Sequence, residues 1–295
     1  SDVNGGPHVP EHAQGGRGFS GTNSSMKLQL HAVFAAFLAA GSIAQAACPP
    51  AEGVDIYPTA KVLPENLLRV YVYYPRPMSA GEGLQHVRLL KGDGVALADV
   101  FLTNRADLWS PDRRRLTLLL DPGRVKTGLI ANENLGRALV DGASYILDVS
   151  GFALDKTGCP LGKDTQHSFD VENADTDPPD PARWTIVTPR AHSTDTLRVD
   201  LGSAHDHLSM AFRLRVLDKD GNTVPGAVAL GPEEELWEFT PRAAWTAARY
   251  TLAIDERLED LAGNRPGRLF DRPSDQAPSP WMQSLDFIPK EQVKQ

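Results

Sequence analysis

The amino-acid sequence contains an internal repeat, which restricts the possible folds more than any other feature. Leu68-Arg69-Val70 recurs as Leu197-Arg198-Val199, and each copy is followed by an Asp-Gly dipeptide, at 93–94 and at 220–221. Further segments recur in the same order: 108–109 as 236–237, 145–149 as 250–254, and 154–158 as 258–263. Such ordered recurrence is rare by chance, so the sequence predicts two copies of one structural unit.

Each unit has the residue pattern of strands joined by turns. Residues 68–74 are rich in valine and tyrosine, and residues 213–217 and 250–254 alternate in the way of half-buried strands. The Asp-Gly dipeptides favour hairpin turns, because glycine adopts a positive φ at low cost. We therefore expect an all-β fold in which each unit is an antiparallel β-sandwich.

An acidic, proline-rich segment separates the two units. It contains Pro178, Pro179 and Pro181, and proline is excluded from the interior of a sheet because it lacks a backbone donor. This composition is typical of a stiff linker. The sequence predicts a first domain over 47–174, the linker over 175–182 and a second domain over 183–290.

The segment before the first unit has the organisation of an export signal. Residues 1–25 are rich in glycine and polar residues, and we expect a disordered or non-native extension there. From Met26, one lysine precedes the apolar run 32–40 and the small residues at 44–46, which is the order of a secretory signal peptide over 26–46. A lipoprotein signal and a buried helix are the alternatives. The signal peptide predicts a periplasmic or secreted protein whose mature chain begins at Ala47.

The chain has two cysteines, Cys48 and Cys159. An even number of cysteines in an exported chain indicates a disulfide, here Cys48–Cys159. The wide spacing fits neither a zinc site nor a redox CxxC motif. A closed loop of about 110 residues corresponds to about 4.7 kcal/mol of stabilisation as an upper figure from chain entropy.

Charge and motif content narrow the function classes. The formal net charge is −8, and an acidic chain is a poor ligand for nucleic acid or anionic lipid, so we expect neither as a partner. No later apolar stretch reaches the roughly 20 residues that a membrane span requires. The sequence contains no G-x-S-x-G, no H-E-x-x-H and no glycine-rich phosphate loop, so we expect no catalytic residues and no cofactor.

Two segments resemble a known family. Residues 74–79, Tyr-Pro-Arg-Pro-Met-Ser, resemble the F-S-x-P-M-D strand end of bacterial Ig-like domains of the S-layer type, and residues 258–264 resemble their closing D-x-A-G-N turn. The resemblance covers about residues 50–290 and implies two tandem Ig-like antiparallel β-sandwich domains that act as spacers, adhesion units or accessory modules. The sequence departs from the family at 204–206, where Ala-His-Asp replaces P-M-D, and at 159–160, where Cys-Pro replaces Gly-Asn.

The two units differ in the length of one connection. Trp109 and Tyr145 are 36 positions apart but Trp237 and Tyr250 only 13, so the first unit carries about 23 extra residues, placed at 121–141. An insertion on a sandwich lies at a loop or an edge, where binding residues gather, so we predict a contact surface for an anionic group or an acidic partner. A cover for a sheet edge is the alternative. The predicted binding residues are Arg124, Lys126 and Arg137.

Other candidate sites have structural explanations. The 205–207 segment, His-Asp-His, is the one local cluster of potential metal ligands, but two histidines do not make a site, and we expect a turn or a strand end. The 218–222 segment begins like a calcium loop but lacks the later glutamate, so a hairpin turn is expected. Trp109 and Trp237 are expected in the two cores, although an exposed tryptophan could stack on a sugar.

Two functions fit these observations. The first is a non-enzymatic exported interaction or scaffold module that presents the insertion to a protein or to an envelope glycan. The second is a hydrolase, or the accessory domain of one, that acts on envelope polysaccharide. The lack of a catalytic motif favours the first.

Overall fold

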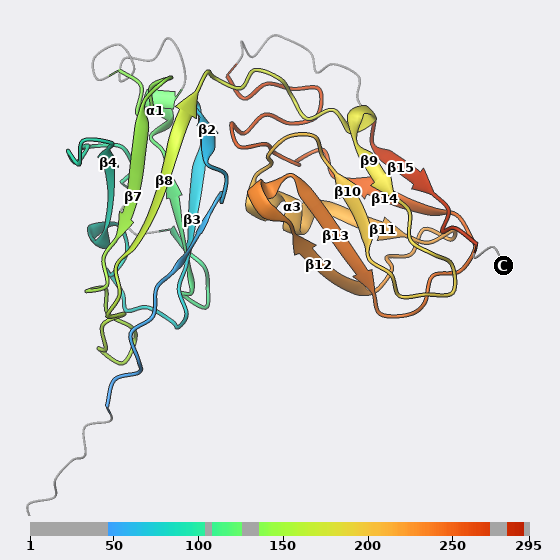
Figure 1. Cartoon of the computed structure of the whole chain (residues 1–295), viewed down its shortest axis with the longest axis horizontal. Coiled ribbons are helices and arrows are strands. Elements are labelled where there is room, and N and C mark those ends of the chain that lie inside the picture. The colour runs from blue at the N-terminus through green and yellow to red at the C-terminus, as the bar shows by residue number, and fades with distance from the viewer. Residues whose placement is uncertain (1–46, 104–107, 126–135, 272–281, 292–295) are drawn as a thin grey trace, which may run out of the picture. The chain divides into compact units, whose positions relative to one another are not determined.

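The computed structural model describes residues 47–103, 108–125, 136–271 and 282–291 (Figure 1). Strands make up most of its secondary structure, which confirms the expected all-β fold. The predicted signal peptide, Lys126 and Trp281 lie outside the described residues. Among the described residues, no helix is both long enough and apolar enough to cross a membrane.

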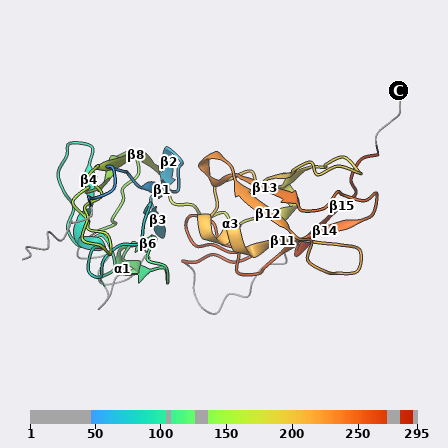
Figure 2. The same ribbon diagram turned by 90° about the horizontal axis from the view of Figure 1, so that it is seen from below.

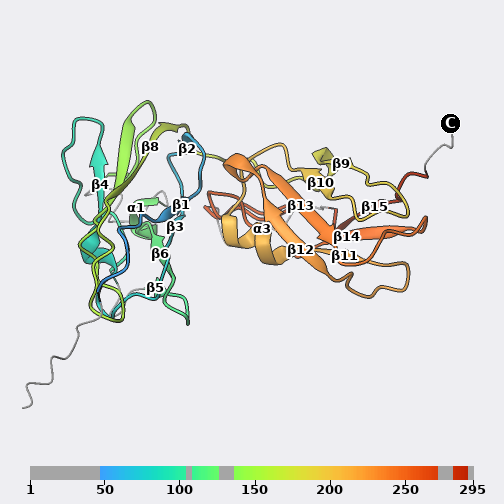
Figure 3. The ribbon, with the colours of Figure 1, turned by 60° about the horizontal axis from the view of Figure 1, so that its bottom comes forward.

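The strands before the proline-rich segment, here called the first half, form two four-stranded sheets (Figure 3). They are β1 (Asp55–Tyr57), β2 (Val62–Pro64), β3 (Arg69–Tyr73), β4 (Val87–Lys91), β5 (Leu108–Trp109), β6 (Arg115–Leu119), β7 (Ser144–Val149) and β8 (Thr165–Glu172). The strand orders are β1-β3-β6-β5 and β2-β8-β7-β4. Every pair is antiparallel except β2 with β8, which is parallel.

The two sheets of the first half share one hydrophobic core. Val70 and Val72 on β3 point into this core and are at most 5% exposed. Because side chains alternate along a strand, Arg69, Tyr71 and Tyr73 lie on the opposite face of the same sheet. This outer face therefore carries large aromatic and cationic side chains.

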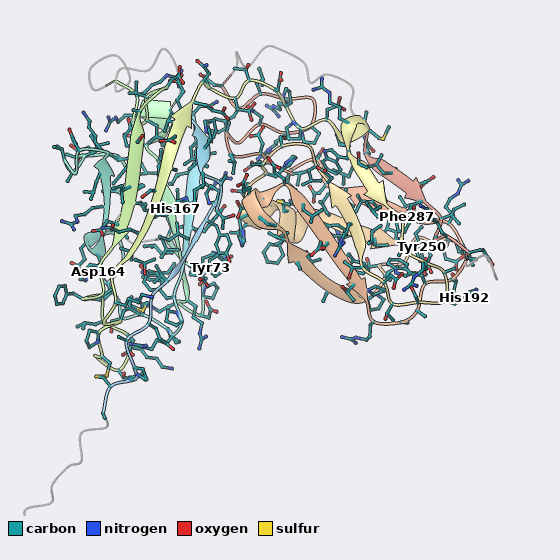
Figure 4. All side chains as sticks on the ribbon, in the orientation of Figure 1. Tyr73, Asp164, His167, His192, Tyr250 and Phe287 are labelled. Atoms are coloured by element: carbon teal, nitrogen blue, oxygen red, sulfur yellow. A yellow bond between two sulfur atoms is a disulfide. The ribbon has the colours of Figure 1, made fainter. Side chains whose placement is uncertain are left out.

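The strands after the proline-rich segment, here called the second half, also form two sheets. They are β9 (Thr185–Val187), β10 (Leu197–Asp200), β11 (Leu214–Leu217), β12 (Gly226–Leu230), β13 (Leu236–Pro241), β14 (Tyr250–Ile254) and β15 (Ser284–Phe287). The orders are β12-β13-β10-β9 and β11-β14-β15, and all pairs are antiparallel. Trp184, Trp237 and Trp245 lie in a second core, where Tyr250 and Phe287 stack with ring centres 5.7 Å apart (Figure 4).

Helical segments are short. Within the described ranges, the α-helices are α1 (Pro122–Val125) and α3 (His207–Arg213), and the 3-10 turns are Leu84–His86, Pro181–Arg183 and Pro232–Glu234. α3 begins after Asp206, whose carboxylate accepts a hydrogen bond from the backbone N–H of Ser209 at 2.8 Å. The helix lies beside β11 and β12 (Figure 2).

The two halves have corresponding strand connections. β3, β4 and β7 take the places of β10, β11 and β14 in the pairing scheme. In each half the first strand pairs antiparallel with the next long strand, β1 with β3 and β9 with β10. The chain between these two strands makes a parallel pairing with the other sheet. In the first half this pairing is β2 with β8, and in the second half it is a single bridge from Arg190 to Lys290. The duplication and the division into two domains remain predictions: the pairings agree with a duplication, while Leu261 of the second half packs into the core of the first.

The matching of the two tryptophans is wrong. Trp237 on β13 lies opposite Val199, and in the first half the residue opposite the corresponding Val70 is Leu118 on β6. Trp109 belongs to β5, the neighbouring strand. Trp237 is fully buried, as expected, whereas Trp109 is half-buried and packs at the margin of the first core. The Leu-Trp dipeptide therefore lies on β5 in the first half and on β13 in the second, and these two strands do not correspond in the pairing scheme.

This correction shortens the insertion. From Leu118 to Tyr145 there are 27 positions, against 13 from Trp237 to Tyr250, so the first half carries 14 extra residues rather than about 23. Part of that length, 126–135, lies outside the described residues.

The predicted disulfide is confirmed. Cys48 and Cys159 are bonded, with their Cα atoms 5.5 Å apart. Cys159 lies in a turn that follows β7 and contains Asp155 and Gly158. The bond thus fastens the segment before β1 to the connection between β7 and β8.

The turns after β7 and β14 are built in the same way. Asp155 accepts hydrogen bonds through Oδ1 from the backbone N–H groups two and four residues later, at 2.8 and 3.0 Å. Asp260 does the same, at 2.9 Å in both cases. Gly158 and Gly263 adopt φ values of 82° and 78° in these turns, a conformation that favours glycine. We refer to them as the Asp155 turn and the Asp260 turn.

Candidate anion-binding groove

The structure describes two of the three predicted binding residues of the insertion, Arg124 and Arg137, and both hold parts of the first half. Arg124 is only 7% exposed, and its guanidinium donates to the carbonyl oxygens of Ala98 and Asp99 at 3.1 and 3.0 Å and to those of residues 136 and 137. Arg137 is half-buried, with Nε 3.3 Å from the carboxylate of Glu65. Both side chains thus hold backbone and carboxylate groups of the fold. A binding role for Arg124, Lys126 and Arg137 remains a prediction.

The His-Asp-His segment has separate structural roles for its three residues. His205 is fully buried and forms a bridge with Asp260, while Asp206 caps α3 and His207 is the first residue of that helix. The histidines are therefore not on one strand face. Nowhere in the described ranges do three or more His, Cys, Asp or Glu residues gather as metal ligands. The expected hairpin at 218–222 is present, with Asp218 accepting from the N–H groups of Asp220 and Asn222.

The outer face of the sheet formed by β1, β3, β6 and β5 contacts the second half. The ring of His207 lies on that of Tyr57 with centres 3.8 Å apart, and 5.6 Å from that of Tyr73, which Figure 4 labels on β3. The hydroxyl of Tyr71 donates to Asp206 at 2.8 Å. Tyr71 is thus buried in this contact, whereas Tyr73 remains half-buried.

A groove of about 440 Å³ opens beside this contact. Its lining comes from β3, β6, α3 and the segment around the Asp260 turn, and we call it the arginine groove. The lining residues are Arg69, Tyr71, Arg115, Asp206, Leu208, Ser209, Phe212, Arg213, Arg257, Glu259 and Arg265. Five of these are arginines and two are carboxylates.

Glu259 is held by two of the arginines. Nη1 of Arg69 lies 2.5 Å from its carboxylate, and Arg265 donates to it from Nε and Nη2 at 3.0 and 2.7 Å. Burial alone would lower the pKa of Arg69, but the neighbouring Asp206 and Glu259 outweigh burial and raise it. Arg69 is therefore a permanent cation in the wall of the groove.

Asp255, just outside the groove, holds the other pair. Arg257 donates to both of its oxygens, at 2.9 and 2.8 Å, and Nη1 of Arg213 lies at 3.5 Å. The hydrogen bonds from Arg257, which outweigh the effect of burial, lower the pKa of Asp255, so this carboxylate remains charged at neutral pH. The side chain of Arg257 is still 56% exposed, and that of Arg265 is 42% exposed.

Arg115 differs from the other four arginines. Within the part of the chain that the structure describes, it has no carboxylate partner, and its Nε is buried without a hydrogen bond. Even if Asp255 is counted with Asp206 and Glu259, the five guanidiniums leave two positive charges at the groove. This local charge contrasts with the net charge of −8 for the whole chain.

Asp206 is the most buried acidic residue in the wall. Burial raises its pKa, while Arg69 and the hydrogen bonds from Ser209 and Tyr71 act in the opposite direction. Both of its oxygens have partners in the fold, Oδ1 from Ser209 and Oδ2 from Tyr71. Asp206 therefore positions the wall and is not presented to a ligand.

An apolar side chain adjoins these charges. Phe212, near the end of α3, lines the groove and is 66% exposed. The groove thus offers guanidinium groups for an anion and an aromatic ring for an apolar part of the same ligand.

Comparisons with known proteins find similarity only in solved structures. No protein-family model matches the chain, and a search of curated proteins finds no match. The S-layer protein SbsC shares 12% identity over 70% of this chain and 24% of its own, with a TM-score of 0.28. A chimeric titin shares 14% over 66% and 84%, with a TM-score of 0.23, and native alpha-2-macroglobulin from Escherichia coli shares 8% over 81% and 72%, with a TM-score of 0.25.

These similarities are weak. The chain spans about a quarter of the length of the SbsC structure. The described fold, with its facing sheets and two cores, agrees with the Ig-like β-sandwich architecture, and function has to be argued from the groove itself.

Proposed function

We propose that this protein is a non-enzymatic exported module that binds an anionic group of its partner in the arginine groove. The observation that carries the proposal is the gathering of five arginines around one hollow on an acidic chain. Such an arrangement costs repulsion unless an anion shares it, and the lining carboxylates compensate only part of the charge. The disulfide supports the export that the predicted signal peptide requires.

The geometry suits a carboxylate or a phosphate group. Arginine presents a planar set of donors that matches either group in a bidentate manner. The side chains of Arg257 and Arg265 remain about half exposed, while Asp255 and Glu259 hold their orientation. An anion entering the groove would therefore meet donors that are already positioned, which reduces the entropy cost of binding.

A hydrolase acting on envelope polysaccharide remains the second candidate. Asp206 and Glu259 both lie within 3.5 Å of Nη1 of Arg69, so the groove does contain two neighbouring carboxylates. Glycosidases use such pairs, but one carboxyl must be able to reach the substrate as an acid. Asp206 is buried and its oxygens are held by Tyr71 and Ser209, which favours the binding function.

Binding of polyanions with and without the groove arginines tests the proposal. We expect the purified chain to bind polygalacturonate, a carboxylate polymer, or polyphosphate, in a manner that weakens with salt. The double variant Arg257→Gln/Arg265→Gln should bind the preferred polymer at least about 10-fold more weakly, because each lost charge-assisted contact weakens binding by about 1.5 kcal/mol or more.

A matched control has the same charge change elsewhere. Arg198 and Arg249 are also exposed and also pair with a surface carboxylate, so Arg198→Gln/Arg249→Gln should bind as the wild type does. Equal affinity of the two double variants would overturn the proposal. Turnover of the polysaccharide that is abolished by Glu259→Gln would instead establish the hydrolase.

A further inference from the structure

A second hollow adjoins the arginine groove. It measures about 570 Å³ and includes the ends of β3 and β6, with Tyr73, Pro75, Pro111 and Arg114 in its lining. Arg115 lines both hollows. In the register of the sheet, Tyr73 lies directly opposite Arg115, so the aromatic ring of one hollow and the shared guanidinium are neighbours on one face.

The second hollow has a different chemistry from the arginine groove. Tyr73 is half-buried and lines this hollow, and the two prolines add apolar surface. Asp112 is exposed and accepts a hydrogen bond from the hydroxyl of Ser110, which, with the backbone N–H of Arg114, lowers its pKa and keeps it an acceptor. Aromatic surface beside both donors and acceptors is the chemistry that recognises a sugar ring and its hydroxyl groups.

Arg115 joins these two environments: its side chain interacts with that of Tyr73 and also lines the arginine groove. Its Nε is buried and has no hydrogen-bond partner, and no carboxylate among the described residues pairs with it. A guanidinium without a carboxylate partner leaves a positive charge in the wall that both hollows share, and this charge attracts an anionic group of a ligand. A ligand that occupies both hollows would therefore contact Arg115.

We infer that the two hollows form one binding path for an acidic polysaccharide, with its carboxylates in the arginine groove, a sugar ring against Tyr73, and Arg115 in contact with the ligand between them. The inference rests on the proposed function and specifies its ligand. Each hollow has the volume that holds a ligand of a few rings, so the path accommodates an oligosaccharide rather than a single acidic sugar. A repeating uronic acid chain supplies an anionic group and an apolar ring face in every residue, which an acidic peptide does not.

Oligogalacturonides of defined length test the inference, measured by calorimetry on the full chain. The single sugar, the trimer and the hexamer serve as probes, with hexaglutamate as an acidic peptide of equal charge. We expect the hexamer to bind at least about 10-fold more tightly than the trimer, because it reaches the second hollow. Hexaglutamate should bind more weakly than the hexamer.

Variants in the second hollow separate the two parts of the path. Tyr73→Ala should weaken hexamer binding about 5-fold or more and leave trimer binding unchanged. Arg114→Gln should have the same effect without removing a ring from the packing. Arg115→Gln should weaken both. Phe152→Ala removes a ring that is 79% exposed in another part of the first half, and it should leave all affinities unchanged.

The possible failures are distinguishable. If the hexamer binds no more tightly than the trimer, or if neither Tyr73→Ala nor Arg114→Gln affects it, the two-hollow path is wrong while the arginine groove still stands. If hexaglutamate binds more tightly than the hexamer, the ligand is an acidic peptide and the inference is overturned. If no oligogalacturonide binds in a way that depends on Arg257 and Arg265, and polyphosphate fails as well, the proposed function itself is wrong.

Discussion

The Asp155 turn and the Asp260 turn have the same backbone and opposite electrostatics. In both, Oδ1 of the aspartate holds the turn, and the residue that bridges to it from the facing segment is fully buried, Met78 in one and His205 in the other. The second carboxylate oxygen makes the difference. Oδ2 of Asp155 accepts from Nε of Arg76 at 2.6 Å, whereas Oδ2 of Asp260 is buried with no hydrogen-bond partner.

The two aspartates therefore have pKa values shifted in opposite directions. Burial alone would raise the pKa of Asp155, but hydrogen bonds from Thr157, the backbone and Arg76 outweigh burial and lower it to about 2. At Asp260, burial dominates, the nearby Asp175 adds to it, and the pKa is raised well above its ordinary value. One aspartate is a stable anion, and the other is costly to ionise.

The cause lies in what covers each turn. The residue after Asp155 is the exposed Lys156, whereas the residue after Asp260 is Leu261, which packs into the core of the first half and whose carbonyl accepts from the N–H of Leu68 at 2.9 Å. The two turns thus share one backbone hydrogen-bonding pattern, while the residue after the aspartate is exposed in one turn and buried in the other.

Opening the disulfide should have the largest effect on stability among these changes. It affects only the Asp155 turn, because that turn alone carries a covalent bond to another segment. Reduction, or Cys48→Ser/Cys159→Ser, should lower the free energy of unfolding by about 4 kcal/mol, as expected for a loop of about 110 residues. Urea unfolding followed by circular dichroism measures this. A change near zero would show that the turn holds the segment before β1 without the bond.

Replacing the charged aspartate has the next largest expected effect. Asp155→Asn should destabilise the protein by about 2.5 kcal/mol at pH 7, because Arg76 loses the more buried of its two carboxylate partners and keeps only Glu52. Because the folded pKa is lowered to about 2, this contribution is present above the ordinary pKa near 3.8 and is lost as the pH falls through 2. Wild type and variant should therefore converge in stability near pH 2, and a constant difference down to that pH would contradict the ion pair.

The buried histidine makes the Asp260 turn sensitive to mild acid. Burial lowers the pKa of His205 to about 4, so its contribution is present above about 6.5 and is lost as the pH falls towards 4. His205→Met, which copies Met78, should reduce the loss of stability between pH 7 and pH 5 by about 2 kcal/mol. Burial also lowers the pKa of His167 on β8, so the variant His167→Gln measures the acid sensitivity that arises outside the Asp260 turn. Equal pH dependence in the wild type and His205→Met would rule out this role.

The smallest expected effect is an increase in stability, whereas the corresponding substitution in the Asp155 turn lowers stability. Asp260→Asn keeps the Oδ1 acceptor and removes a buried carboxyl that is difficult to ionise, so it should raise stability at pH 7 by about 1 kcal/mol. Because the folded pKa is raised, the wild type loses stability as the pH rises above the ordinary value, and the variant should lose less. The comparison would fail if Asp260→Asn destabilised the protein as strongly as Asp155→Asn does.

Much of the fold could be predicted from the sequence, because it depends on local patterns. The Leu-Arg-Val strands, the Asp-Gly turns and the closing turns recur at equivalent places, and the cysteine pair is confirmed. The tryptophan match failed because a dipeptide fits any of several neighbouring strands with the same alternation. Which strand a Leu-Trp pair occupies depends on pairing partners far away in the sequence.

The groove was not predicted, because its arginines come from separate segments of the chain. Arg69 and Arg115 meet only through the pairing of β3 with β6, and Arg257 and Arg265 stand on either side of the Asp260 turn. One signal was present in the sequence: on β3, Tyr71 and Tyr73 alternate with core valines, so both faces of that strand require cover. The insertion stood out by its length, but Arg124 is used for holding backbone carbonyls, which length alone does not reveal.

The disulfide also determines how the protein responds to mechanical load. The bond joins Cys48 to Cys159 across 111 sequence positions, so a pull on the chain before Cys48 passes directly to the connection before β8. Strands β1 to β7 lie inside the closed loop and are shielded from extension. At about 3.5 Å per residue, roughly 380 Å of chain stays hidden until the bond is reduced. If the protein tethers its partner under tension, only the chain after Cys159 can therefore extend. The first half from β1 to β7 can extend only after the bond is reduced.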